Sequence, residues 1–402
     1  MKILVLNCGS SSVKYKLIDT DTDVTMAEGG VEKIGLEDGF LKFKKPDGSK
    51  EIKQLGLIDH KAAVMAILEN LTDPNVGCIK SFEEIDAVGH RVVHGGEKFA
   101  SSVLITNEVI QQVKDCYDLA PLHNPANITG IEAITALLPD VPQVGVFDTA
   151  FHQTMPARSF MYAIPYEYYK NDGVRRYGFH GTSHRYVSQR AAEILGEPIE
   201  KLKMVTCHIG NGGSITAVDG GKSIDTSMGL TPTEGLMMGT RTGDIDPGAI
   251  TYLMTKHGMS ASDVQTLINK KSGVAGISGI SNDMREIEAA VNAGDPRAKL
   301  ALDMYELRIL KYVGAYAAEM GGLDVIVFTG GVGENQTGVR ENVCEPLKFM
   351  GVEIDKELNA VTRGTETIIS TPSSRVKVLI VPTDEELTIA RDTQEIVSKL
   401  KK

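Results

Sequence analysis

The sequence predicts an α/β protein that is built from a duplicated domain. Short apolar runs that suit buried strands alternate with stretches of helical periodicity, and this alternation indicates an α/β fold. A pattern at residues 3–19 also returns half a chain later, at 204–219. The chain has 402 residues. Because single hydrophobic cores stop growing near about 250–300 residues, we expect two domains.

The expected elements follow from the spacing of apolar residues along the chain. Two strands, joined by a turn of small residues, are expected at 3–7 and 13–19. Buried strands are also expected at 86–93, 144–147, 204–209, 325–328 and 377–381. Helical periodicity appears at 60–71, 184–195, 297–320 and about 385–401.

The repeat consists of "ILVLNCGSSSVKYKLID" (3–19) and "MVTCHIGNGGSITAVD" (204–219). Each copy is an apolar strand with a polar residue at its end, a cluster of small residues, and a returning strand closed by Asp. Identities are few, but the spacing of half the chain is typical of duplication. We therefore expect each half to open with the same hairpin, with a cleft between the halves.

The turns of these hairpins suit phosphate binding. Glycine lets backbone approach a ligand closely, and successive N–H groups form a concave anion site. Serine hydroxyls and Lys14 add donors, so two such turns would hold a polyphosphate, although a plain hairpin would explain either turn alone. A P-loop is excluded at Gly221-Lys222-Ser223 because Thr216 stands where that motif needs glycine, and no G-x-G-x-x-G follows a strand. A third glycine turn, at 325–335, suits a nucleotide or an ordinary loop.

The composition excludes several classes of partner. Hydrophobic residues make up 42% and charged residues 24%, and no apolar run approaches the ~18 residues of a membrane span. The start lacks a signal-peptide pattern, and the five cysteines form no C-x-x-C pair, so we expect a cytoplasmic protein with reduced thiols and no membrane partner. The net charge of −11 argues against a nucleic-acid partner. An acidic protein that binds anions must concentrate positive charge locally.

Several short strings together resemble the acetate kinase family of the actin-like superfamily, which also contains sugar kinases and heat-shock chaperones. The resemblance runs in order from residue 2 to about 393, and the string at 238–248 is the most specific. The strings are "NCGSSSVKYKL" (7–17), "RVVHGG" (91–96), "PLHNP" (121–125), "VFDTAFH" (146–152), "YGFHGTSH" (177–184), "HIGNGGS" (208–214), "MGTRTGDIDPG" (238–248), "FTGGVGEN" (328–335) and "PTDEELTIARDT" (382–393).

The resemblance implies duplicated actin-like (ribonuclease H-like) domains with a nucleotide cleft between them. The N-terminal domain would comprise 1–150 plus 386–402 and lie on the carboxylate side, and 151–385 would form the nucleotide side. It also implies a homodimer, and reversible in-line transfer of the ATP γ-phosphoryl group to acetate, giving acetyl phosphate and ADP. A propionate or butyrate kinase on the same scaffold is one alternative. An actin-like ATPase acting on a protein partner is another, but such a protein has no use for paired arginines.

The chemistry of a carboxylate acceptor calls for positive charge rather than a general base. A simple carboxylic acid has a pKa of about 4–5, so the nucleophile is already ionised near neutral pH. The protein must neutralise charge on the moving phosphoryl group. Arg91 and Arg241 lie among small or polar residues near turns, where a surface ion pair would also explain either one. By resemblance, Arg91 holds the acetate carboxylate and Arg241 assists it and the transition-state oxygens.

His180 is the other candidate for stabilising charge, since the resemblance has it bonding the phosphoryl oxygens. A zinc site with His184 is disfavoured because Gly181 stands where H-E-x-x-H requires Glu. Thr182 or Ser183 is expected to cap the following helix.

Asp148 ends the strand 144–147, where α/β sheets present polar residues to a ligand. The resemblance makes it an active-site residue. Its better physical role is to orient an arginine or the metal shell, and helix capping is the alternative. His123 would contact the substrate side, or serve packing alone.

The remaining site residues are implied by the resemblance. Mg²⁺, or Mn²⁺, would be held by Asn7 and by Glu385, the first of two consecutive acids, unless these acids only complement a helix dipole. A small acyl pocket would be formed by Val93, Leu122, Phe179 and Pro232, for which core packing is the alternative. One methylene is worth only ~1–3 kcal/mol there, so propionate is expected to be a poorer substrate. The expected ATP contacts are Ser10, Ser12, Lys14, His208, Ile209, Gly210, Asn211, Gly212, Asp283, Met284, Arg285, Gly331, Val332, Gly333, Glu334 and Asn335.

Overall fold

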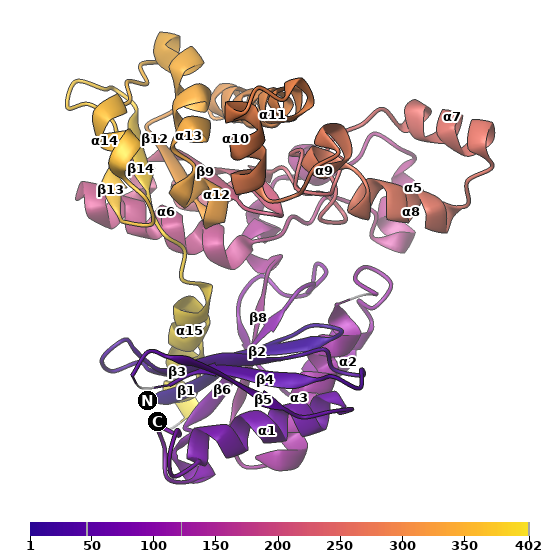
Figure 1. Ribbon diagram of the computed structural model, residues 1–402, viewed down its shortest axis with the longest axis vertical. Coiled ribbons are helices and arrows are strands. Elements are labelled where there is room, and N and C mark those ends of the chain that lie inside the picture. The colour runs from indigo at the N-terminus through magenta and orange to yellow at the C-terminus, as the bar shows by residue number, and fades with distance from the viewer. Residues whose placement is uncertain (46, 122, 401–402) are drawn as a thin grey trace. The chain divides into compact units, whose positions relative to one another are not determined.

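The computed structural model describes residues 1–45, 47–121 and 123–400. These residues divide into two compact units, Met1–Ala150 together with the chain from Asp384, and Phe151–Thr383. Asp384 and Glu385, which the sequence analysis placed in the second domain, therefore belong to the first unit. In Figure 1 the yellow C-terminal helix accordingly lies among the indigo and purple elements of the first unit.

The first unit is built on an eight-stranded sheet of order β5-β4-β3-β2-β1-β6-β8-β7. β1 is antiparallel to β2 and parallel to β6, which is parallel to β8. The predicted strands at 3–7, 13–19, 86–93 and 144–147 are confirmed as β1, β2, β6 and β8. The strands are β1 (Lys2–Cys8), β2 (Ser12–Asp19), β3 (Val24–Glu32), β4 (Phe40–Lys44), β5 (Lys50–Gln54), β6 (Ala87–Val92), β7 (Val103–Leu104) and β8 (Gln143–Phe147).

Helices cover both faces of this sheet, which explains the unbroken apolar run at the start of β1. Leu4 and Leu6 pack in one core with α1 and α3, whereas Ile3 and Val5 pack in a second core with α15. A strand buried on both faces needs apolar residues at every position. The helices of this unit are α1 (His60–Thr72), α2 (Asn107–Lys114), α3 (Asn124–Leu137) and α15 (Glu385–Leu400), with a short 3₁₀ turn at Phe82–Glu84.

The second unit has a six-stranded sheet of order β11-β10-β9-β12-β14-β13. β9 is again the strand buried on both faces: Val205 and Cys207 pack in a core with α11, and Met204 packs with Val187 of α6. The strands are β9 (Lys203–Ile209), β10 (Gly213–Asp219), β11 (Lys222–Thr226), β12 (Val325–Thr329), β13 (Thr367–Ile368) and β14 (Lys377–Ile380).

The helices of the second unit include the predicted long one at 297–320. It forms α11, whose Asp295 cap accepts bonds from the amides of Arg297 and Ala298. The helices are α4 (Ala157–Phe160), α5 (Tyr166–Asp172), α6 (Gly181–Leu195), α7 (Pro247–His257), α8 (Ala261–Lys270), α9 (Gly273–Ser278), α10 (Met284–Asn292), α11 (Pro296–Glu319), α12 (Gly330–Asn335), α13 (Thr337–Cys344) and α14 (Lys356–Val361). Shorter 3₁₀ turns occur at Ala150–Thr154, Ile199–Lys201 and Glu345–Met350.

The two sheets confirm the duplication that the repeat predicts. The order β3-β2-β1-β6-β8-β7 of the first unit matches β11-β10-β9-β12-β14-β13 of the second, and β4 and β5 extend only the first sheet. In each unit a third antiparallel strand follows the hairpin. On the other side of the first hairpin strand, β1 or β9, lie two strands parallel to it, and the edge strand beyond them is antiparallel. The chain therefore has the predicted duplicated α/β fold.

Two local expectations need correction. The predicted cap of the helix at 184–195 is wrong, because α6 already begins at Gly181 with His180 at the cap position. The third glycine turn is not an open loop, since Gly330–Asn335 forms the short helix α12. Among the described residues, no helix combines the length and the apolar character that crossing a membrane requires.

Candidate active site

In the first unit, Arg91 and Asp148 form a two-bonded ion pair at the ends of neighbouring parallel strands. Arg91 Nε donates to Asp148 Oδ1 at 3.0 Å and Nη2 donates to Oδ2 at 2.6 Å. The Asp148 side chain is 2% exposed and that of Arg91 27%. The carboxylate raises the pKa of Arg91 above its usual value, against the effect of burial. Asp148 thus orients an arginine and caps no helix, and Arg91 makes a partly buried pair rather than a surface one.

Glu385 lies within electrostatic reach of this pair, at the start of α15. Burial, and to a lesser extent the charges of Asp148, Glu386 and Asp384, raise its pKa to about 7 against the lowering effect of Arg91. A cation would stabilise the ionised form of a carboxylate that is surrounded by other acidic groups.

A cavity of about 290 Å³ opens beside the first hairpin. Asn7 of β1 and Glu386 both line it, together with Lys14 and Lys16 of β2. Lys16 pairs with Glu386 at 3.2 Å, whereas among the described residues no carboxylate pairs with Lys14, which stands opposite Asn7 in the ladder. The hairpin thus presents an amide oxygen and an unpaired ammonium group at one place.

The donor set fits magnesium in its usual partial coordination by protein. Mg²⁺ keeps several waters and takes one or two protein oxygens, and amide and carboxylate oxygens are hard donors of this kind. The cavity lining brings Glu386 together with Asn7, so Glu385 as the second ligand stays a prediction. Within the described ranges, no group of three or more His, Cys, Asp or Glu residues forms a ready-made metal cage. A metal here would therefore depend on ligand phosphates and water for the rest of its shell.

Two buried asparagines of α3, which the sequence analysis missed, hold the segment after β6. Asn127 accepts a bond from the Val93 amide at 3.0 Å and donates to the Cys8 carbonyl at 2.8 Å. Asn124 accepts from the His94 amide at 3.1 Å. The sequence analysis predicted no helix over 124–137, so the two amides gave no usable signal there. His123 occupies the cap position of α3 without a side-chain capping bond, and Leu122 lies outside the described residues.

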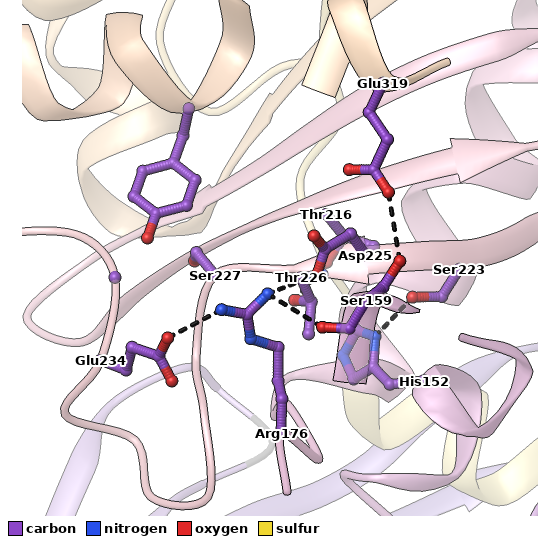
Figure 2. A network of polar contacts seen from close by, with 12 residues as sticks. His152, Ser159, Arg176, Thr216, Ser223, Asp225, Thr226, Ser227, Glu234 and Glu319 are labelled. Carbon is purple, nitrogen blue, oxygen red and sulfur yellow. Dashed lines mark hydrogen bonds and ion pairs between the residues drawn. The ribbon is translucent and has the colours of Figure 1, made fainter. Parts of the chain in front are cut away.

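In the second unit, His180 has a strained backbone that its surroundings impose. Its φ is 55°, in the left-handed region that residues other than glycine rarely adopt. The preceding backbone is held at two points: the Gly178 amide donates to the Gly229 carbonyl at 3.2 Å, and His152 Nε2 donates to the Phe179 carbonyl at 2.8 Å. Figure 2 shows His152 with its second partner, Ser223.

Hydroxyl groups connect His180 to a cluster of histidines. Ser214 Oγ lies 2.9 Å from His180 Nδ1 and 2.7 Å from His184 Nε2. The His180 and His208 rings stack with centroids 4.2 Å apart, and Ser183 Oγ bonds His208 Nδ1 rather than capping α6. Burial lowers the pKa of His184, and both of its nitrogens bond hydroxyls, which argues against zinc there.

Arg241 lies beside His180 and has no carboxylate partner among the described residues. Its Nη1 donates to the Pro232 carbonyl at 3.4 Å and approaches Met238 Sδ at 3.7 Å. A Cβ added to Gly212 would meet Arg241 Nη1 at 3.2 Å and His180 Cε1 at 4.0 Å, so the second hairpin turn touches both. Burial lowers the pKa of Arg241. A half-buried guanidinium without a counter-ion suits an anionic ligand.

The hairpin turn at 208–212 packs against the glycine turn that opens α12. Gly330 has φ of 77°, and a Cβ there would lie 2.8 Å from the backbone of Ile209, so only glycine fits. Glu334 accepts a bond from the Gly330 amide at 2.8 Å, and Asn335 donates to the Gly331 carbonyl at 2.9 Å. The side chains of Glu334 and Asn335 thus hold the turn, and its backbone faces the hairpin.

The third predicted nucleotide segment, 283–285, joins this group through a neighbour that the sequence analysis missed. Asn282 donates to Asn211 Oδ1 at 2.9 Å. Asp283 caps α10 and binds Arg285 in an exposed pair, and Met284 is buried.

Arg340 is a further residue that the sequence analysis missed. Its fully buried guanidinium donates to the Gly333 carbonyl at 2.9 Å, the Asn359 amide oxygen at 2.8 Å and the Thr362 carbonyl at 2.7 Å. Arg340 therefore stabilises α12 through its bond to the Gly333 carbonyl.

The proposed acyl-pocket residues are described only within their own units. Val93 is 7% exposed and Phe179 3% exposed, and Pro232 is half-buried. Their shared pocket stays a prediction.

Comparisons with known proteins agree over the whole chain. Residues 2–391 match the acetokinase family. The chain is 62% identical over 399 residues to the acetate kinase of Parabacteroides distasonis, covering 99% of this chain and 100% of that protein. It superposes on the crystal structure of Porphyromonas gingivalis acetate kinase with a TM-score of 0.97 at 59% identity, covering 98% and 99% of the two chains. A propionate kinase from Francisella tularensis gives a TM-score of 0.91 at 45% identity, with the same coverage.

Proposed function

The chain belongs to the acetokinase family, and on this basis we propose that it transfers the γ-phosphoryl group of ATP reversibly to acetate, giving acetyl phosphate and ADP. The observation that carries the proposal is identity of about 60% to acetate kinases over the whole length. The geometry of both units supports it, because each holds an arginine suited to an anion.

Arg91 is proposed to bind the acetate carboxylate. Arginine has five N–H donors, and Asp148 uses one on Nε and one on Nη2. The others stay available to an incoming carboxylate, and the fixed plane of the guanidinium sets its direction. Asp148 then acts by orientation, since an ionised acid needs no base.

Arg241 and His180 are proposed to neutralise charge on the transferred phosphoryl group. Transfer of this kind is stabilised mainly by positioning and by positive charge on the phosphoryl oxygens. The turns at 208–212 and 330–335 are proposed to bind the nucleotide through their backbone amides, with Ser10, Ser12 and Lys14 of the first hairpin as further phosphate contacts. We propose direct in-line displacement, because the roles proposed for these residues require none of them to carry the phosphoryl group.

Magnesium is proposed as the cofactor, with Asn7 and Glu385 as the residues that would hold it and Mn²⁺ as an alternative of the same oxygen preference. When bound, it would supply positive charge that neutralises the nucleotide phosphates.

A short-chain acyl kinase of broader range is the second candidate. The similarity to a propionate kinase at 45% identity favours it, and a small apolar pocket discriminates weakly between acids that differ by one methylene. An actin-like ATPase that acts on a protein partner has less support, because it would not need Arg91 and Arg241.

A homodimer is proposed to form through α11. Leu300, Met304 and Leu307 lie on one face of this helix, yet are 52%, 37% and 50% exposed. An apolar stripe left open to water is typical of an interface. We also propose a cytoplasmic location, which suits the five free cysteines.

Trapping of the acyl phosphate with hydroxylamine tests the reaction. We expect hydroxamate from ATP with acetate, less from propionate, and little from butyrate. Hydrolysis of ATP that is indifferent to acetate would reject the proposal in favour of the ATPase, and equal kcat/KM for acetate and propionate would favour the broader kinase.

A further inference from the structure

Arg176 occupies the centre of a polar network in the second unit (Figure 2). Its Nη1 donates to Asp225 Oδ1 of β11 at 2.7 Å, and its Nη2 donates to Glu234 Oε1 at 2.7 Å. The same Nη1 lies 3.5 Å from the Ser159 carbonyl. Arg176 is 17% exposed, so these bonds form largely out of water. One guanidinium thus joins three segments that are distant in sequence.

The carboxylate partners of Arg176 are held in turn. Glu234 also accepts a bond from the Tyr162 hydroxyl, and that hydroxyl accepts one from the Leu230 amide at 2.9 Å. Gly229 permits this contact, since a Cβ there would lie 1.9 Å from Glu234 Oε2. Burial and the charge of Glu319 raise the pKa of Asp225 to about 6 against the opposing effect of Arg176. The carboxylate therefore depends on Arg176 to stay ionised.

Glu234 belongs to residues 227–246, the loop between β11 and α7 that carries Arg241, which we call the Arg241 loop. Pro232, two residues before Glu234, supplies the carbonyl that accepts from Arg241 Nη1. A bond that fixes Glu234 therefore fixes the residue that orients Arg241.

Arg176 also precedes His180 by four residues. The Arg176 amide donates to the Phe160 carbonyl at 2.8 Å, and the Tyr177 and Gly178 amides both donate to the Gly229 carbonyl of the Arg241 loop. The backbone that leads to His180 is thus tied to the same loop.

We propose that Arg176 is a positioning residue for the reaction: through Glu234 and the Arg241 loop it holds Arg241 and His180 in register, without touching substrate. This inference rests on the proposed function for its kinetic consequences. Lysine cannot replace Arg176 here, because a single ammonium group lacks the planar fork that reaches two carboxylates in different directions.

The test compares three variants with a matched control. Arg176→Lys removes the guanidinium that bonds both carboxylates. Glu234→Gln weakens the bond to Arg176 and leaves the bond to Asp225 in place. Tyr162→Phe removes the hydroxyl that bonds Glu234 and the Leu230 amide. Arg190→Lys is the control, since Arg190 makes a similar fork to Glu366 in the same unit, but on the surface. For each protein, kcat and KM are measured for acetate and ATP, and amide hydrogen exchange is followed over 227–246.

We expect Arg176→Lys and Glu234→Gln to lower kcat at least tenfold, with KM for ATP within twofold of wild type, and exchange in the Arg241 loop to quicken at least tenfold. Tyr162→Phe should change both in the same direction, and the control neither. Unchanged kcat and exchange would overturn the proposal, as would an equal loss of kcat and ATP affinity with general unfolding. If Arg176→Lys does not fold, the other two variants decide. Should the wild type lack acetate-dependent activity, the proposed function fails, while unchanged or quickened exchange still decides whether Arg176 holds the Arg241 loop in place.

Discussion

Replacement of Asp148 by asparagine separates an orienting role from a chemical one. The change keeps the size of the side chain, but turns one oxygen that accepts from Arg91 into an N–H group that faces a donor. One charge-assisted hydrogen bond is lost, worth about 1.5–3 kcal/mol. Since 1.4 kcal/mol is a factor of ten, kcat/KM for acetate should fall by about 10–150-fold.

The same variant has a bounded effect on folding. Breaking a fully buried ion pair costs about 3–5 kcal/mol, but Arg91 is 27% exposed and can still be hydrated. We expect a smaller loss of unfolding free energy, about 1–3 kcal/mol, measured by urea denaturation. KM for ATP should stay near its wild-type value, because Asp148 is proposed to act only by orienting the arginine that binds acetate.

Steady-state kinetics in the hydroxamate assay provides the measurement. Asp115→Asn serves as the control, since Asp115 pairs with Lys98 on the surface. An unchanged kcat/KM for acetate in Asp148→Asn would refute the orienting role. A loss beyond about 10⁵-fold that Asp148→Glu fails to restore would refute it in the other direction, by requiring chemistry at this carboxyl.

Three further predictions follow from burial, backbone conformation and charge. Burial lowers the pKa of His152 to about 4, so the unfolded chain takes up a proton there that the folded chain does not. His152 alone should therefore contribute about 3 kcal/mol to the fall in unfolding free energy between pH 6.5 and 4, and urea titrations of His152→Gln should show a fall smaller by that amount. Gly330→Ala must strain a residue at φ of 77° against Ile209, so KM for ATP should rise at least about tenfold, whereas Gly331→Ala has open space and should not change it. Glu385→Gln should weaken Mg²⁺ activation about tenfold or more. In the wild type this activation should decline below pH 7, because the Glu385 carboxyl, whose pKa is raised to about 7, must lose its proton to bind a cation, and the decline should be absent from the variant. An unchanged Mg²⁺ dependence would exclude Glu385 as a ligand.

Much of the fold follows from local patterns. The run Ile3–Leu6 predicts a buried strand, and the structure places helices on both faces of it. The repeated hairpin predicts the duplication, because strand, polar end, small-residue turn and returning strand each leave a local signature.

The supports of the site could not be predicted in this way. Arg340 acts on Gly333, and Asn127 acts on Cys8, through bonds that cross the fold. Such bonds have no period, so a single sequence does not indicate them. Ser183 shows the converse. A local rule favours it as a helix cap, but in the structure its hydroxyl bonds His208 instead.

The most direct test of the account is the rate of acetyl hydroxamate formation by Arg241→Ala beside wild type and Arg190→Ala. An arginine that stabilises charge on a transferred phosphoryl group is worth about 10³–10⁵ in kcat. The account predicts a loss of that size for Arg241→Ala with the urea midpoint preserved, and wild-type rates for the surface control. A folded Arg241→Ala enzyme that works within tenfold of wild type would contradict it.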